Sequence, residues 1–245
     1  MLNKLCLLWQ DVVTRQWFHV ANLTKNSTGT YRFSYERNES NKGLRAAIDH
    51  GYRLHPTFED VTKEYVSKKC FSVFDRRLPN LNRRDYQQAY QELGISSTSS
   101  VFEVLTLTGG ILRSDSYEFV EPITLDADNH YCLNCYLRGW RYYNEDNEPL
   151  LDTDILSLKL DEQNKYDENA VCVITCNNKT IGYLPSFYSE FVRNQILDNH
   201  LGYELDFKYN EHVPSHYKVR LTIKGQLASE ALENVSNKAP LFLLK

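Results

Sequence analysis

Three short motifs in the C-terminal half of this 245-residue chain combine side chains that can hold an unstacked nucleotide. The first motif spans residues 139–143, the second 164–167 and the third 181–185. Together they supply aromatic faces for base stacking, one guanidinium and one carboxylate. The candidate binding residues are Arg141, Tyr142, Tyr143, Asn164, Tyr166, Asp167 and Tyr183.

A simpler interpretation treats the same residues as structural. Asn164 and Asp167 are typical turn residues, because their side chains bond nearby backbone, and tyrosines commonly fill sheets. The order and spacing of all three motifs favour a binding site over this interpretation.

A second candidate surface is a run of arginines in the N-terminal half, formed by Arg76, Arg77, Arg83 and Arg84. Guanidinium groups suit contacts to phosphates or carboxylates, so this possible secondary basic patch is a candidate for nucleic acid or an acidic partner. A solvated helix face or loop explains such a run more simply, and we favour that explanation.

The sequence predicts no metal and no cofactor. Cys132 and Cys135, with Cys172 and Cys176, suggest a zinc site by their spacing. Both pairs fall in or beside predicted strands, however, where residues three apart point to opposite faces. We therefore expect these cysteines to be free thiols that mainly fill the core.

Nothing in the sequence indicates an enzyme. It has no Walker A loop, no Rossmann glycine pattern and no Ser-His-Asp order. A nuclease or other hydrolase would have to use the acidic residues Asp161, Glu162, Asp167 and Glu168, and a solvated turn explains these more simply.

Composition indicates a globular protein with room for two cores. Hydrophobic residues make up 42% of the chain and charged residues 24%. Without an export signal or a long apolar segment, we expect a cytoplasmic protein with no membrane contact. Net charge is −4, and residues 129–227 carry 10 Lys or Arg against 14 Asp or Glu, so any binding of nucleic acid must be local.

The apolar pattern predicts an α+β fold in two domains. In residues 1–122 it indicates strands near 5–8, 17–23, 29–35 and 116–122, with a hairpin turn at 26–29. A strand-to-helix passage is expected over 65–74, and helices over 85–94 and 101–110, the latter capped by Ser100. The first domain is therefore predicted to be a small antiparallel sheet with two or three helices.

After a polar break near 125–130, the pattern changes to short strands around one helical stretch. Strands are expected at 131–137, 155–160, 170–175, 180–183 and 217–223, and the helix at 185–199. This predicts a second domain, residues 129–227, that is a small antiparallel β-barrel-like fold or a rolled sheet with one or two helices. Residues 228–245 are predicted to be a C-terminal tail that begins as a helix and ends in an apolar segment.

The three motifs resemble the HIRAN domain, a small module that binds nucleic-acid ends. The resemblance implies that Arg141 holds a phosphate, that Tyr142 and Tyr166 stack the last bases, and that Asn164 orients the sugar or Asp167. It also implies that Asp167 recognises a 3′ end, because a carboxylate accepts a hydrogen bond from a hydroxyl and repels a phosphate.

Tyr183 departs from the pattern of the best-known eukaryotic member, which has a histidine there. A tyrosine can stack but cannot supply a cation.

Residues 1–122 resemble the N-terminal subdomain of HipA-type toxin kinases, which also occurs alone as a HipS-like protein. The matching segments are 20–24, 29–35, 74–80, 107–110 and 114–115. The ATP-binding and catalytic core of such a kinase has no counterpart in this chain, so the resemblance implies no kinase activity.

These observations predict a non-enzymatic protein that binds single-stranded DNA, at a 3′-hydroxyl end. The two resemblances imply a bacterial toxin-antitoxin or phage-defence setting. The alternative is an antitoxin-like interaction module whose first domain binds and restrains a separate HipA-like kinase.

Overall fold

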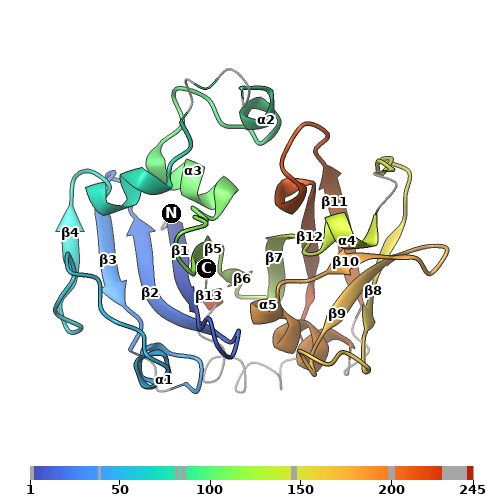
Figure 1. Cartoon of the computed structure of the whole chain (residues 1–245), viewed down its shortest axis with the longest axis horizontal. Helices are drawn as coiled ribbons and strands as arrows, with labels where there is room; N and C mark the ends of the chain where they lie inside the picture. Colours follow the sequence, from blue (N-terminus) through green and yellow to red (C-terminus); the bar gives the residue numbers. More distant parts are fainter. Residues whose placement is uncertain are drawn as a thin grey trace. The chain divides into compact units, whose positions relative to one another are not determined.

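The computed structural model describes residues 3–37, 40–80, 83, 87–144, 148–197, 202–227 and 242–244. The chain divides into two compact units (Figure 1). The first is built mainly from Met1–Gln87 and Gly94–Pro122, and the second mainly from Ile123–Val235 together with Gln88–Leu93. Within the described ranges, no helix is long and apolar enough to cross a membrane.

The first unit contains an antiparallel sheet, as the sequence predicts, and its strand order is β4-β3-β2-β1-β5. The strands are β1 (Asn3–Gln10), β2 (Trp17–Lys25), β3 (Tyr31–Tyr35), β4 (Tyr65–Ser67) and β5 (Tyr117–Val120). The predicted turn between β2 and β3 is confirmed: the Asn26 side chain accepts hydrogen bonds from the backbone of Thr28 and Thr30, and Gly29 has a φ of +80°.

Short helices surround this sheet. They are α1 (Leu44–Asp49), the 3-10 helix η1 (Ser72–Arg77) and α3 (Val101–Thr108). Ser100 caps α3 as expected, and Gly109 ends the helix in the left-handed conformation. Helix α2 (Gln87–Glu92) belongs largely to the second unit, and its predicted start at residues 85 and 86 lies outside the described residues.

Aromatic side chains form the centre of the first core. Alternate residues of β3 point inward, and the Phe33 ring stacks on Phe58 with centroids 3.9 Å apart. Phe74 of η1 packs edge-on against Phe119 of β5 at 5.1 Å. Ring contacts thus join strand and helix, and each contributes stabilisation in addition to that from the apolar area it buries.

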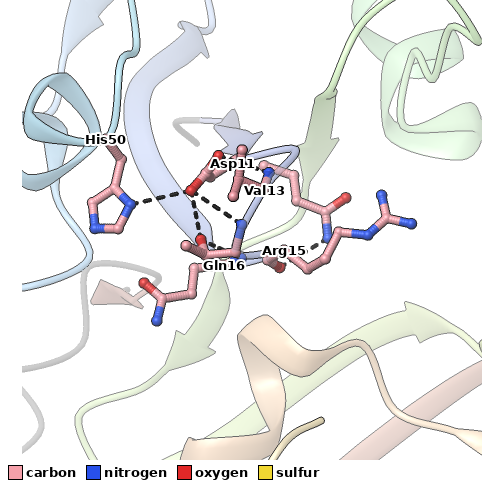
Figure 2. Close-up of polar contacts among 7 residues, drawn as sticks. Asp11, Val13, Arg15, Gln16 and His50 are labelled. Atoms are coloured by element: carbon pink, nitrogen blue, oxygen red, sulfur yellow. Dashed lines mark hydrogen bonds and ion pairs between the residues drawn. The ribbon is translucent and has the colours of Figure 1, made fainter.

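The loop between β1 and β2 is held by one carboxylate (Figure 2). Asp11 accepts hydrogen bonds from the backbone of Val13 and from the Thr14 hydroxyl, and contacts His50 Nδ1 at 3.2 Å. The Thr14 and Val13 bonds keep the pKa of Asp11 below its usual value. The loop exposes Val12 and Val13, which are 67% and 84% accessible.

The second unit contains two open antiparallel sheets, so the prediction of a β-barrel-like domain is wrong. One has the order β10-β9-β8, and in the other β11, β12, β7 and β6 follow in that order. The strands are β6 (Ile123–Leu125), β7 (His130–Tyr136), β8 (Leu156–Leu160), β9 (Val171–Thr175), β10 (Thr180–Tyr183), β11 (Tyr203–Tyr209) and β12 (Val219–Gln226).

The two sheets meet without a continuous ladder. An isolated bridge joins Arg138 to Tyr183, and the backbone N–H of Leu158 in β8 donates to the phenol oxygen of Tyr203 in β11. The described strands therefore form two open sheets and not a closed barrel.

The helices of the second unit are short. They are α4 (Trp140–Tyr143), α5 (Ser186–Phe191), the π-helix η3 (Val192–Leu197) and the 3-10 helix η4 (Ser215–Tyr217). Helices α5 and η3 lie in the helical stretch predicted over 185–199. Strands β6 and β11 were not predicted. The predicted helix of the tail lies outside the described residues, and β13 (Phe242–Leu244) is a short strand divided between the two units.

Candidate functional site

Helix α4 presents the first motif to solvent. Gly139 begins it with a φ of +81°, a conformation that glycine adopts without strain. Trp140 is buried, with its ring 5.7 Å from that of Tyr209, and this anchors the single turn. Arg141 is exposed, and Tyr142 projects outward with 79% of its surface accessible.

The second motif forms a tight turn between β8 and β9. The side-chain oxygen of Asn164 accepts hydrogen bonds from the backbone N–H groups of Tyr166 and Asp167, at 3.0 and 3.1 Å. Asp167 in turn accepts one from the backbone of Asn169 at 2.9 Å. The turn chemistry expected for Asn164 and Asp167 is therefore present, but Tyr166 is 98% exposed and fills no sheet.

The third motif brings Tyr183 against the first. Backbone hydrogen bonds of 2.8 and 2.9 Å pair Tyr183 with Arg138, two residues before α4. Gly182 permits this approach, because a Cβ there would lie 2.4 Å from the Arg138 carbonyl oxygen. As a result, the Tyr183 ring lies 5.4 Å from the Tyr143 ring at an angle of 54°.

Asp161 connects these motifs and was not among the predicted binding residues. Its Oδ2 accepts hydrogen bonds from the Tyr183 hydroxyl at 2.7 Å and from the Asn164 amide at 3.1 Å. The bond from Tyr183 is the main reason that the pKa of Asp161 lies below its usual value. Burial, followed by the bond to Asp161, raises the pKa of Tyr183.

The described structure thus links much of the predicted set. Tyr143 contacts Tyr183, and Tyr183 is joined through Asp161 to the turn that carries Tyr166 and Asp167. Arg141 and Tyr142 lie on the same helical turn as Tyr143. The arrangement offers exposed aromatic faces beside carboxylates, and Arg141 supplies the guanidinium of the three motifs.

The possible basic patch is not a single surface. Arg77 is buried, donates to the Gly110 carbonyl at 2.8 Å and to Asp115 at 2.6 Å, and lies over the Tyr117 ring. Arg77 therefore supports the first core. Arg76 and Arg83 are exposed, and Arg84 lies outside the described residues.

Cys132 and Cys135 lie at positions of β7 that face opposite sides of the sheet, as expected. Among the described residues, Asp126, Asp128 and His130 are close enough to share a cation. Their arrangement follows from the hairpin between β6 and β7, because Asp126 accepts hydrogen bonds from the backbone of Asp128 and His130.

Comparison with known families matches residues 130–228 to the HIRAN domain. The solved structures that match include the crystal structure of the HIRAN domain of human HLTF, at 23% identity and a TM-score of 0.35, covering 43% of this chain and 83% of that one. The NMR structure of the HLTF HIRAN domain in its DNA-bound conformation matches at 24% identity and a TM-score of 0.30, covering 43% and 82%. A search of curated proteins gave no match.

The family match covers the second unit, so the resemblance of residues 1–122 to the HipA N-terminal subdomain stays a prediction.

Proposed function

Residues 130–228 form a HIRAN domain, and from this premise we propose that the chain binds single-stranded DNA, at a 3′-hydroxyl end, and acts as a binding protein without catalysis. The proposed binding surface, called the pocket below, consists of the exposed face of α4, the 164–167 turn and Tyr183. We further propose a bacterial toxin-antitoxin or phage-defence setting, which the resemblance of residues 1–122 supports.

The observation that carries this proposal is the exposure of two tyrosines from separate motifs. Tyr142 and Tyr166 are 79% and 98% accessible, and both lie on elements that hydrogen bonds or packing fix in place. Unstacked bases bind to such faces, and a stacked base contributes about 1 to 3 kcal/mol by alanine substitution.

Asp167 supports the preference for a hydroxyl end. Its Oδ1 accepts a hydrogen bond from the Asn169 backbone, which fixes the carboxylate of the residue that follows the exposed Tyr166. An ionised carboxylate accepts a hydrogen bond from a terminal hydroxyl, whereas it repels the negative charge of a terminal phosphate.

The test is fluorescence anisotropy at fixed, moderate salt with a short strand ending in a 3′ hydroxyl and the same strand ending in a 3′ phosphate. The wild-type chain should prefer the hydroxyl end. Tyr166→Ala should weaken binding by about 5- to 150-fold, the equivalent of one stacked base. Absence of binding to both strands by the wild-type chain would refute the proposal.

A matched pair of variants isolates the end preference. Asp167→Asn should bring the two affinities together, because the amide no longer repels the phosphate. Glu168→Gln removes one negative charge from the adjacent exposed residue and should preserve the preference. An equal effect of both substitutions would show that general charge, and not Asp167, sets the preference.

A second candidate is a protein-interaction role for the first unit, in which it binds and restrains a separate HipA-like kinase. The exposed Val12 and Val13 favour it, because Asp11 holds the loop that carries them (Figure 2). Fixed apolar side chains of this kind suit a protein contact.

Co-purification with a HipA-like kinase tests this second role. Val12→Asp combined with Val13→Asp should abolish the association while single-strand binding persists. Association that survives both substitutions would remove this loop from the interface.

A further inference from the structure

We propose that Asp161 is a positioning residue of the pocket: its carboxylate binds the Tyr183 hydroxyl and the Asn164 amide, and so fixes the Tyr143–Tyr183 pair against the terminal base. This inference rests on the single-strand binding proposed above. It adds a residue that the three motifs do not contain.

The geometry places Asp161 where two parts of the pocket meet. It directly follows β8, and its backbone N–H donates to the Ala170 carbonyl at 2.9 Å, which fixes its position at the start of the loop. One carboxylate oxygen then accepts from both Tyr183 in β10 and Asn164 in the turn, at 2.7 and 3.1 Å. Loss of this oxygen would release both partners at once.

The charges indicate what the fixed pair does. Tyr183 supplies no cation, and the carboxylate bound to its hydroxyl is an acceptor, so the Tyr183–Asp161 pair itself offers no charge attraction to a phosphate. What Tyr183 can offer is its ring, which lies 5.4 Å from that of Tyr143. Since stacking depends on ring placement, the hydrogen bond that sets the Tyr183 ring should affect recognition of the base.

The energetic scale is large enough to measure. A hydrogen bond to a charged group contributes more than one between neutral groups, and fixing the ring before binding avoids ordering it on binding. We expect Asp161→Ala to weaken binding about 10-fold, and Tyr183→Phe, which keeps the ring, to weaken it by a similar factor.

The experiment compares two strands with 3′-hydroxyl ends, one with an ordinary terminal nucleotide and one whose terminal nucleotide is abasic. Asp161→Ala should lose about 10-fold on the ordinary strand and a clearly smaller factor on the abasic one, where only the bond to Asn164 still affects binding. The Asp161→Ala/Tyr183→Phe double variant should be no weaker than the weaker single variant, because both remove the same bond.

Two further variants separate this role from simpler ones. Glu162→Ala removes a negative charge one residue away on an exposed side chain and should bind like wild type. Asp161→Asn retains an acceptor for Tyr183 and should restore part of the loss, and it provides a second test if the alanine variant folds poorly.

Several results would overturn the inference. Equal losses of affinity on the ordinary and abasic strands would indicate that Asp161→Ala destabilises the whole site. Additive losses of affinity in the double variant would indicate that Asp161 and Tyr183 act independently. Tighter binding by Asp161→Ala would indicate that Asp161 only repels the strand by its charge. If Asp161→Ala binds like wild type while Tyr166→Ala binds more weakly, only the role of Asp161 fails. If the wild-type chain binds neither strand, the proposed function fails with it.

Discussion

At the scale of single residues, buried His19 should make the stability of the first unit depend on pH. Its Nε2 lies 3.1 Å from the Ala21 carbonyl oxygen and 2.9 Å from the Asn22 side-chain oxygen. Burial lowers the pKa of His19 to about 4, so the folded chain holds this imidazole neutral. An unfolded chain takes up the proton near its ordinary pKa of about 6.5.

The contribution of neutral His19 to the free energy of unfolding is therefore fully present above pH 6.5. It decreases as the pH falls from 6.5 toward 4, by roughly 3 kcal/mol in all. Urea unfolding at several pH values between 6.5 and 4.5 measures this decrease. His19→Gln removes the titrating group and should flatten the profile in this window. An equally steep profile in the variant would assign the effect to other groups.

Gly182 should be intolerant of any side chain. A Cβ would lie 2.4 Å from the Arg138 carbonyl oxygen and 2.7 Å from Leu137 Cγ, so β10 would have to move away from the end of β7. Gly182→Ala should destabilise the second unit by about 2 to 4 kcal/mol and weaken single-strand binding, because Tyr183 is the next residue. Gly202→Ala is the control, since nothing lies within 4 Å of its added Cβ. Thermal unfolding of both variants would show whether only Gly182 is constrained.

The site was predictable from sequence where its chemistry is local. Asn164 and Asp167 bond backbone groups two or three residues away, and such turns are encoded by residue type. The link between Asp161 and Tyr183 joins residues 22 positions apart, and the sheet that brings them together has no local signal. The sequence does hint at Asp161 in one way: it is a polar residue of the same loop, three positions before Asn164.

At the scale of elements, the start of α3 depends on a reciprocal cap. The Ser100 hydroxyl accepts a hydrogen bond from the Glu103 backbone, and the Glu103 carboxylate accepts one from the Ser100 backbone. Ser100→Ala should destabilise the first unit by about 1 kcal/mol, measured by urea unfolding. Glu103→Gln preserves an acceptor for the Ser100 backbone and should cost much less. Equal losses would mean that the charge of Glu103, and not the cap, stabilises the helix.

Elements with strong local signals were predicted well, and those without them were missed. The hairpin at 26–29 has turn residues between alternating strands, and α3 has a cap and a terminal glycine, so both were found. Strand β6 is three residues long and forms only beside β7. Strand β11 does alternate between more buried and exposed positions, a signal that was available and overlooked.

At the scale of the whole molecule, the pattern of strands in the sequence could not predict whether the sheets of the second unit close into a barrel. Sequence order predicts short antiparallel strands, but whether two edges join depends on what occupies the space between them. Here the Tyr203 hydroxyl accepts the Leu158 N–H that a closed barrel would pair with backbone. The fold class was therefore predictable, whereas the open form of its sheets was not.

The charge of the molecule sets how its binding should respond to salt. Net charge is −4, and residues 129–227 carry 10 basic against 14 acidic residues, so few phosphates can be neutralised at once. Each phosphate contact on a single strand contributes about −0.7 to the slope of log K against log salt concentration, and we expect a total slope of about −1 to −2. Anisotropy titrations between low and moderate salt measure it.

Substituting one arginine in each unit shows which of them contributes to the salt dependence of binding. Arg141→Gln should reduce the slope by about 0.7, because its guanidinium is the predicted phosphate contact. Arg76→Gln removes an equivalent exposed charge from the first unit and should leave the slope unchanged. A wild-type slope steeper than about −4 would instead require a broad basic surface, which the composition of residues 129–227 does not provide. Recognition of single strands by this chain should therefore depend on stacking and on the chemistry of the strand's end more than on charge.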